Sequence, residues 1–458
     1  MDVPSAPSLT DLPAGTDPAL TGRTVEVLQA LIRCACVNDG TAASGHEHRA
    51  VAVLDEVLDG LDLVHYEPAP GRRSLLATLE GTDPAAPTLL LLGHTDVVPV
   101  TRDAWRHDPF GGELLDGEVW GRGAVDMLNL TSSMAVAVHH LATRGRRPRA
   151  TVKFLAVADE EAGGTYGAQW ITDHAWADVA ADAVLTESGG LTVGGPGGGA
   201  LVIATAEKGI AWRRLTVLGT PGHGSMPYRA DNALVTAAEV VRRLSAFDPA
   251  ATLHEHWRAW VRHLDIDDGL RALLLDPARL AEGFERLDHR AARYAHACTH
   301  TTFSPNVIHG GTKMNVIPDA VHLDIDIRTL PGIADTEVDA MLAEALGDLA
   351  ERVVVAPGEV KRPATASAVD TEVFDLLRRR AAAVHPDREV LPWMTVGGTD
   401  AAFFRQRGVP AYGTGMYSAA LPLEEFQSRY HGHDERIDLA SLALTTQLWL
   451  DLVDGLGG

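Results

Sequence analysis

The stretch from Thr88 to Pro99 reads TLLLLGHTDVVP and decides the fold of this chain. Its apolar run is too short for a helix, so the pattern predicts a buried strand that ends in His94 and Asp96. Side chains alternate along a strand, and these two therefore point to the same side. A His and an Asp at the open edge of an α/β sheet lie where such folds bind a metal or a substrate. Taken alone, the stretch is also compatible with a solvated loop after a core strand.

Around this strand, helical and strand patterns alternate through the first 208 residues. Helical spacing covers residues 24–34, 47–58 and 126–141, and short apolar runs predict strands at 75–79, 151–157 and 183–185. The alternation predicts an α/β catalytic domain with a mainly parallel sheet flanked by helices. Polar residues follow two further strands, at Glu160, Glu161 and Glu187. They therefore gather at the same edge as His94.

The pattern changes at about residue 209. Strand patterns at 211–218, 303–308, 320–328 and 353–355 and helical patterns at 232–244 and 335–349 give the order β-α-β-β-α-β. We expect an inserted α+β lid domain over residues 209–360, with a helical insertion at about 249–302. The catalytic domain then consists of residues 1–208 and 361–458. Six histidines of the insertion are predicted to be surface residues and not ligands: His254, His256, His263, His289, His296 and His300.

The bulk composition excludes several classes of function. The 458 residues carry a net charge of −23, which disfavours nucleic acids and anionic membranes as partners. No apolar run reaches transmembrane length, and the N-terminus lacks the basic start and apolar core of a signal peptide. The three cysteines have no zinc-finger spacing, and their pattern favours a reducing, cytoplasmic location.

The strand-end residues, together with two late histidines, have the chemistry of a metal site. His431 and His433 both lie in the segment YHGHDER, residues 430–436. Mixed His and carboxylate ligands suit zinc, or cobalt or manganese. Five ligands with one bridging carboxylate make two sites of three protein ligands each. Both sites then keep open positions for water and substrate.

The arrangement of these motifs resembles the aminoacylase/carboxypeptidase family of dinuclear zinc metallopeptidases. That family includes acetylornithine deacetylase, succinyl-diaminopimelate desuccinylase and the glutamate carboxypeptidases. Three signature blocks match GHTDVVP at 93–99, WGRGAVDM at 120–127 and DEE at 159–161. The family's lid motif matches GTPGHGSMP at 219–227, and its closing block matches HGHDE at 431–435.

The resemblance implies a set of ligands for two divalent metal ions, with zinc first and cobalt or manganese as alternatives. His94, Asp126 and Glu187 would hold one metal, while Asp126, Glu161 and His431 would hold the other. Asp126 is then the bridge. His431 is preferred over His433 because it lies four residues before Glu435 in the closing block, but the pattern leaves His433 as an alternative.

Two neighbouring carboxylates have other roles in this family. Asp96 resembles the residue that orients the imidazole of the first ligand, and the alternative is a plain solvated carboxylate. Glu160 resembles the general base, and the alternative is an ion pair with an arginine. Successive residues at a strand end point in different directions, so Glu160 and Glu161 are not expected to do the same work.

The lid and the late segment supply the residues that would bind substrate. His223 resembles a histidine that reaches a neighbouring active site and hydrogen-bonds to the carbonyl oxygen in the transition state. Asn315, Arg328 and Gly398 match positions that bind the substrate's α-carboxylate. The alternatives are a turn histidine for His223 and a strand-end salt bridge for Arg328.

The resemblance implies metal-dependent hydrolysis of an amide bond adjacent to a free carboxylate. A peptide substrate, as for a dipeptidase or carboxypeptidase, is the first choice, and an N-acyl amino acid is the alternative. A catalytically inactive metal-binding protein of the same fold is the alternative of another class. Leu128 stands where the family commonly has Lys, and no function follows from that change. The large insertion leaves a monomer and a homodimer through the lid domain both open.

Overall fold

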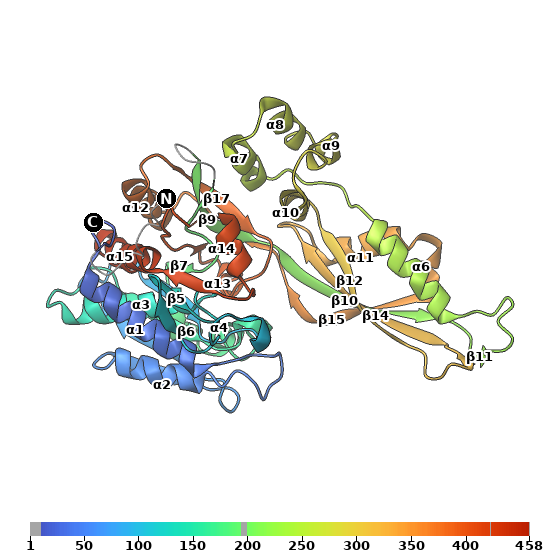
Figure 1. The fold of residues 1–458 in the computed structure, drawn as a ribbon, viewed down its shortest axis with the longest axis horizontal. Helices are drawn as coiled ribbons and strands as arrows, with labels where there is room; N and C mark the ends of the chain where they lie inside the picture. The colour runs from blue at the N-terminus through green and yellow to red at the C-terminus, as the bar shows by residue number, and fades with distance from the viewer. Residues whose placement is uncertain (1–10, 194–198, 422, 458) are drawn as a thin grey trace.

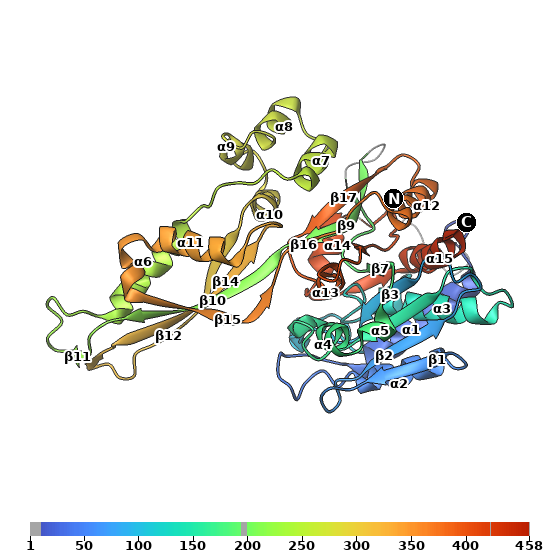
Figure 2. The same cartoon turned by 180° about the vertical axis from the view of Figure 1, so that it is seen from behind.

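The computed structural model describes residues 11–193, 199–421 and 423–457. Figure 1 shows two lobes joined by a narrow connection of strands, and Figure 2 shows the same arrangement from behind. The larger lobe contains the first and the last helix of the described residues, α1 (Pro18–Cys34) and α15 (Leu439–Gly455). Among these residues, no helix is both long and apolar enough to span a membrane.

A ten-stranded sheet forms the centre of the larger lobe. Its main order is β1-β2-β6-β3-β7-β18-β9-β16, and β17 and β8 also pair with β9. The strands are β1 (Asp62–Tyr66), β2 (Ser74–Leu79), β3 (Leu89–His94), β6 (Val152–Val157), β7 (Ala183–Thr186), β8 (Leu191–Val193), β9 (Ala200–Glu207), β16 (Thr365–Ala366), β17 (Glu389–Thr395) and β18 (Ala411–Gly413). β3 pairs in parallel with both β6 and β7. The predicted α/β class is confirmed, with parallel pairing in the middle strands and antiparallel pairing at β1 and β2.

Helices cover both faces of this sheet because β3 is apolar on both sides. Leu89 and Leu91 pack into one hydrophobic cluster, and Leu90 and Leu92 pack into another on the opposite face. The first face is covered by α1 (Pro18–Cys34), α2 (His48–Val57), α3 (Leu128–Thr143), α12 (Glu372–Val384) and α15 (Leu439–Gly455). The second is covered by α4 (Ala168–His174), α5 (Trp176–Val179) and α13 (Ala401–Arg405).

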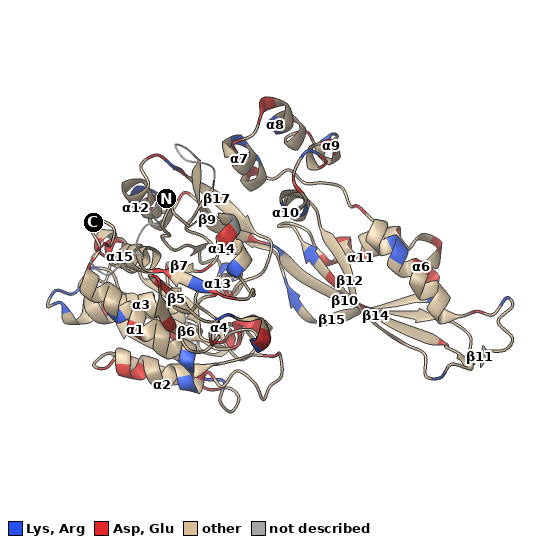
Figure 3. Cartoon of the chain, in the orientation of Figure 1, with Lys and Arg blue, Asp and Glu red and all other residues tan. Residues whose placement is uncertain are grey.

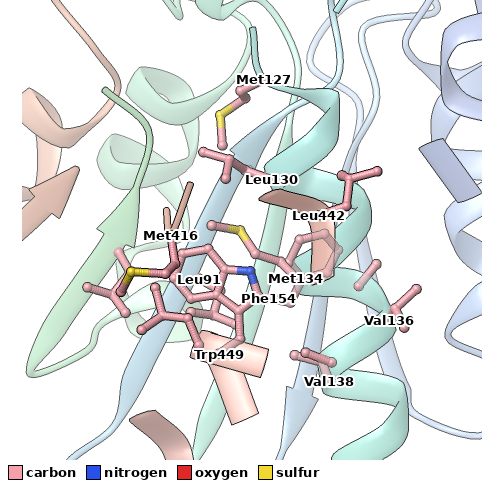
Figure 4. Close-up of a cluster of buried hydrophobic side chains, with 14 of the residues drawn as sticks. Leu91, Met127, Leu130, Met134, Val136, Val138, Phe154, Met416, Leu442 and Trp449 are labelled. Atoms are coloured by element: carbon pink, nitrogen blue, oxygen red, sulfur yellow. The ribbon is translucent and has the colours of Figure 1, made fainter. Parts of the chain in front are cut away.

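The sheet, α3 and α15 pack together in one hydrophobic cluster. Figure 4 shows Leu91 and Phe154 of the sheet beside Met134 of α3 and Trp449 of α15. The indole nitrogen of Trp449 donates a hydrogen bond of 2.9 Å to the hydroxyl of Ser133. This packing fixes α3, whose first turn follows directly after Asp126.

The smaller lobe contains an antiparallel sheet of order β12-β14-β10-β15. Its elements are β10 (Gly209–Leu218), α6 (Ala233–Ala246), β12 (Thr302–Gly310), β14 (Ala320–Thr329), α11 (Asp335–Leu346) and β15 (Val353–Arg362). Along the chain they follow the predicted order β-α-β-β-α-β. Both helices pack on the same face of the sheet, where they bury Leu215, Val240 and Leu342. A small pair, β11 (Gly222–His223) with β13 (Val316–Ile317), lies at the tip of the lobe (Figure 1).

The insertion in the smaller lobe is helical, as its sequence indicated. It contains α7 (Glu255–His263), α8 (Asp268–Leu274), α9 (Leu280–Phe284) and α10 (His289–Thr299). Trp260 and Tyr294 of this insertion pack against Trp393 of β17 in the larger lobe. The insertion is therefore anchored to both lobes.

A small sheet lies at the edge of the larger lobe, next to α14 (Leu423–Arg429). A three-stranded sheet combines β4 (Glu113–Leu115), β5 (Glu118–Trp120) and β19 (Arg436–Asp438). The sequence predicted no strand in these three segments. The pairing of Arg436 with Trp120 in this sheet brings residues 431–435 next to residues 121–126.

Candidate metal centre and active site

Four of the five predicted metal ligands and the predicted base, Glu160, lie at one edge of the central sheet or beside it. His94 is the last residue of β3, Glu160 and Glu161 follow β6, and Glu187 follows β7. Because these strands are parallel neighbours, their carboxyl ends meet at one edge. Asp126 reaches this edge from the residue pair before α3, and its peptide bond to Met127 is cis.

Asp126 lies between two histidines that come from distant parts of the chain. Its Oδ1 is 3.3 Å from Nε2 of His94, and its Oδ2 is 3.0 Å from Nε2 of His431. Glu187 lies 3.9 Å from His94, and Glu161 lies 3.2 Å from His431. One carboxylate therefore faces one histidine with each of its oxygens. This is the arrangement expected of a ligand that bridges two metal ions.

The donor set fits divalent metals on chemical grounds. Two groups of residues could each hold an ion: His94 with Glu160 and Glu187, and His94 with Asp126 and Glu161. Within each group, the donor atoms lie within 4.8 Å of one another. Oε1 of Glu161 is buried without a hydrogen-bond partner among the described residues. Leaving such an acceptor unsatisfied is costly, and a bound cation would satisfy it.

The pKa values of these groups reflect crowded, buried negative charge. Burial and the charge of Asp126 raise the pKa of Glu161 to about 7. Burial and the charge of Glu187 raise the pKa of Glu160 well above its usual value. Hydrogen bonds to Asp126 and Glu161 raise the pKa of His431 to about 10. Carboxylates that oppose one another's ionisation in this way favour a cation among them.

Asp96 holds the segment that carries the two neighbouring glutamates. Its carboxylate accepts the backbone N–H groups of Glu160 at 3.2 Å and Glu161 at 3.1 Å, and the amide of Asn38 at 2.8 Å. The imidazole Nδ1 of His94 lies 2.9 Å from the backbone oxygen of Asp96 but 3.6 Å from its carboxylate. The closest contact that orients His94 is therefore made by the main chain of Asp96, and its side chain orders the glutamates.

A buried ion-pair network supports the same segment from below. Arg72 forms two hydrogen bonds to Glu47, at 2.9 and 2.7 Å, and one of 2.7 Å to Asp159. Asp159 has a left-handed backbone, with φ of 70°. Its other oxygen accepts the N–H of Tyr166 at 2.9 Å. Such a strained residue persists because its side chain is fixed on both sides.

Glu435 plays the corresponding part for Asp126. It is fully buried, and its Oε1 accepts the N–H groups of Val125 at 2.8 Å and Asp126 at 3.1 Å. Its Oε2 accepts a bond of 2.7 Å from the buried guanidinium of Arg122. From the sequence, Glu435 served only to locate His431. Its buried charge makes it a structural support for Asp126.

Four of the five candidate metal ligands, Asp126, Glu161, Glu187 and His431, line a cavity of about 360 Å³. Its walls are largely apolar or neutral, and they are formed by Ser188, Leu191, Val202, Tyr294, Trp393, Thr395, Val396, Gly397, Gly398, Thr399, Leu423, Gln427 and Tyr430. No Lys or Arg is among the described residues that line it. The helical insertion contributes Tyr294, whose ring stacks on Trp393 at 5.1 Å.

Of the four predicted substrate-binding residues, only Gly398 lines this cavity. Arg328 instead pairs with Asp326 at 2.8 Å, the salt bridge that the sequence left as its alternative. His223 and Asn315 lie together at the tip of the smaller lobe, where Gly224 N–H bonds to the oxygen of Asn315 at 2.9 Å (Figure 1). Within one chain, the structure does not bring these three residues to the metal ligands.

Two further observations bear on the choice of site residues. His433 is exposed, and among the described residues it belongs to neither of these two groups of donors. Asp400, which the sequence analysis passed over, is buried, and neither of its oxygens has a hydrogen-bond partner among the described residues. Burial raises its pKa to about 7. The signal for Asp400 was present in the segment GGTD, residues 397–400.

Comparison with known proteins gives a consistent picture. The sequence profile of the peptidase family M20/M25/M40 matches residues 90–455. An N-fatty-acyl-amino acid synthase/hydrolase of Xenopus tropicalis is 27% identical over 390 residues, which make up 84% of this chain and 75% of that protein. Aminoacylase-1 of Sus scrofa is 26% identical over 413 residues, 89% of each chain.

Solved structures share the fold at lower sequence identity. An M20 family metallo-carboxypeptidase from Sulfolobus solfataricus has a TM-score of 0.72 at 18% identity, covering 94% of this chain and 98% of that one. Human carnosine dipeptidase 1 has a TM-score of 0.66 at 18% identity, covering 95% of this chain and 97% of that one. These matches extend over both lobes.

Proposed function

Because the chain belongs to the peptidase family M20/M25/M40, whose members here are metal-dependent amide hydrolases, we propose that it cleaves an amide bond next to a free carboxylate. The observation that carries this proposal is Asp126, which lines the cavity and faces His94 with one oxygen and His431 with the other. A dipeptidase or carboxypeptidase activity is the first choice.

The proposed metal centre contains two divalent ions, with zinc first and cobalt or manganese as alternatives. His94, Asp126 and Glu187 hold one ion, and Asp126, Glu161 and His431 hold the other. When bound, such ions polarise the scissile carbonyl and make a water molecule acidic enough to attack at neutral pH. Asp96 keeps the glutamate segment in register, and Glu435 keeps Asp126 between the two histidines.

Glu160 is the proposed general base. It follows β6 beside the ligand Glu161, lines the cavity, and is fixed through the bond from its backbone N–H to Asp96. Its carboxylate removes a proton from the attacking water and delivers it to the nitrogen of the departing amine. The alternative in which Glu160 pairs with an arginine has no support in the cavity, because no Arg is among its described lining residues.

The smaller lobe is proposed to supply the grip on the substrate carboxylate. Arg328 and Asn315 would bind that group together with the backbone of Gly398, and His223 would donate to the carbonyl oxygen. Because His223 lies at the far tip of its own chain's lobe, we propose that it serves the active site of a second copy. The protein would then be a homodimer through the lid domain, residues 209–360. Its free thiols, Cys34, Cys36 and Cys298, favour the cytoplasm.

A second candidate substrate is an N-acyl amino acid. The cavity beyond the ligands has an apolar wall that includes Leu191, Val202 and Trp393. Such a wall suits an uncharged acyl group better than the free ammonium of a dipeptide, which needs an anionic partner. Both candidates use the same ligands and the same base.

The test is hydrolysis of a panel of dipeptides and N-acetyl amino acids with Zn²⁺ or Co²⁺. We expect turnover that a chelator removes and that Glu160→Gln reduces by at least about 10²-fold, the lower range for a lost general base. The metal content of the Glu160→Gln variant should equal that of the wild type. The exposed Glu344 of α11 provides a matched control, since Glu344→Gln should leave both values unchanged.

Three outcomes would contradict parts of the proposal. Turnover that survives both the chelator and Glu160→Gln would exclude this mechanism. Loss of one metal from Glu160→Gln would make Glu160 a ligand, as its proximity to His94 and Glu187 allows. No turnover across the panel would favour the inactive metal-binding alternative.

Mixing His223→Ala with Glu160→Gln should restore activity only if His223 acts in a second copy.

A further inference from the structure

A second cluster of metal-binding side chains lies at the neck of the helical insertion. It consists of Asp248, His296 and His300, whose donor atoms lie within 4.8 Å of one another. None of the three lines the catalytic cavity. Asp248 stands two residues after α6, where the chain enters the insertion, and His300 caps α10, where the chain leaves it. The cluster therefore joins the two ends of the inserted segment.

The Nε2 atoms of the two histidines face one carboxylate, and because a metal ion lies near the plane of each imidazole that binds it, the stacked rings must turn apart for both to bind one ion. They are four residues apart, with His296 in the last turn of α10 and His300 at its C-cap. Their rings are parallel, within 4°, and their centroids are 4.2 Å apart. Nε2 of His296 is 2.9 Å from Oδ1 of Asp248, and Nε2 of His300 is 3.8 Å from the same oxygen. Both nitrogens thus face one carboxylate.

The hydrogen bonds of His300 leave its Nε2 available to bind a metal ion. Its Nδ1 lies 3.2 Å from the carbonyl oxygen of His296, and 2.9 Å from the hydroxyl of Thr299. A carbonyl can only accept, and the Thr299 hydroxyl already donates to the oxygen of Ala295 at 2.8 Å. Nδ1 therefore carries the proton, and Nε2 presents its lone pair towards Asp248. Metal-binding histidines are commonly oriented by such a bond from the other ring nitrogen.

One nearby charge opposes a cation here. The ammonium of Lys208 donates to the backbone oxygens of Ala297 at 2.8 Å and His300 at 2.7 Å. The carbonyl oxygens at the C-terminal end of α10 carry a partial negative charge, which partly offsets this ammonium next to the cluster.

We propose that Asp248, His296 and His300 form a third metal site, separate from the catalytic centre, which binds Zn²⁺ or a similar borderline divalent cation. Two imidazoles and one carboxylate are ligands that zinc accepts, and three protein ligands leave one position for water. The site closes the neck of the segment between residues 248 and 300. That closure adds to a backbone hydrogen bond across it, from the N–H of Thr252 to the oxygen of Thr299 at 2.8 Å.

A metal at this neck restrains the insertion in the folded chain. Binding to the closed neck alone stabilises it against opening in proportion to the metal concentration. The insertion carries Tyr294 into the wall of the catalytic cavity. The third site therefore holds in place the element that shapes the acyl side of that cavity. The proposal does not depend on which substrate is cleaved.

Zn²⁺ stoichiometry of the full-length protein, measured by mass spectrometry after removal of free ions, tests the site directly. We expect three ions per chain in the wild type and two in both His296→Ala and Asp248→Asn. Asp248→Asn keeps the size of the side chain, so it guards against a folding defect. His289→Ala changes an exposed histidine of the same helix and should keep three ions.

Trypsin cleavage within the insertion gives a second reading, because residues 258–293 contain several arginines, among them Arg258, Arg262 and Arg290. At a free Zn²⁺ concentration of 100 times Kd, cleavage through the opened neck should slow roughly 100-fold in the wild type. The two ligand variants should lose this protection, and His289→Ala should keep it. Equal Zn²⁺ content and equal protection in wild type and both ligand variants would overturn the proposal and leave an ion pair between Asp248 and His296. Loss of an ion from His289→Ala as well would also overturn it.

Discussion

Replacing Glu435 by Gln removes one buried negative charge and keeps the size of the side chain. Glu435 is fully buried, and it accepts three hydrogen bonds, from Arg122 and from the backbones of Val125 and Asp126. A glutamine has only one acceptor oxygen. In either orientation of its amide, an NH₂ group faces a donor, and the buried guanidinium of Arg122 loses its counter-charge.

The magnitude follows from that unpaired charge. Removing one partner of a buried ion pair costs about 3–5 kcal/mol. The side chain of Arg122 is 3% exposed, and its Nε already lacks a partner among the described residues. We therefore expect Glu435→Gln to lower the free energy of unfolding by about 3–5 kcal/mol. The same change frees the backbone of Asp126, so we also expect weaker metal binding.

Urea unfolding of the metal-free protein, followed by tryptophan fluorescence, measures the first effect without a contribution from lost metal. The matched control is the double variant Arg122→Met with Glu435→Gln, which removes both charges and should recover most of the loss. Metal content of the Zn²⁺-loaded single variant measures the second effect. A loss below about 1 kcal/mol together with an unchanged metal content would refute the reasoning, because a surface pair is worth no more than that.

Three other predictions concern the ligand choice, the buried lysine and the cavity wall. His431→Ala should lose one of the two catalytic ions and most activity, while His433→Ala should keep both; metal analysis distinguishes them, and the reverse result would make His433 the ligand. The pKa of Lys208 is about 7 in the folded protein and 10.5 in the unfolded chain. Between these two pH values the unfolded state holds one more proton than the folded state. The free energy of unfolding should therefore rise with pH in this range, by up to about 1.4 kcal/mol per pH unit relative to Lys208→Met. Parallel pH profiles of unfolding free energy for the two proteins would exclude this. Tyr294→Ala should raise KM roughly tenfold for N-acyl amino acids with long apolar acyl groups, because about 1.4 kcal/mol of apolar contact is lost, and should leave N-acetyl substrates unchanged; equal effects on both would show that Tyr294 does not touch the acyl chain.

The catalytic edge could be predicted from the sequence because its signals are local. The run that ends at His94 is buried on both faces, as its four leucines indicated. Glu160, Glu161 and Glu187 follow strands in the same way, and parallel pairing brings strand ends together without further information. The helix-strand order of the smaller lobe was readable for the same reason.

Contacts between distant segments could not be predicted. The left-handed Asp159 and its partner Arg72 are 87 residues apart, and their bond depends on how β2 and β6 pair. β9 escaped notice because its eight buried residues lie next to the change between the two lobes. The same applies to His296 and His300, predicted as surface residues. Only the folded insertion shows that His300 is buried and that both face Asp248.

In the proposed function, the two lobes separate the chemistry of the site from its recognition of the substrate carboxylate. The ligands and the candidate base are fixed at one sheet edge by buried partners such as Asn38 and Arg122, which do not depend on the smaller lobe. Arg328, by contrast, is engaged with Asp326 and reaches the cavity only if that pair opens or the lobes approach. The reaction type therefore follows from residues in one lobe. In the proposed function, the identity of the substrate depends on a second set of contacts, between the lobes and through the insertion, which carries Tyr294 into the cavity wall.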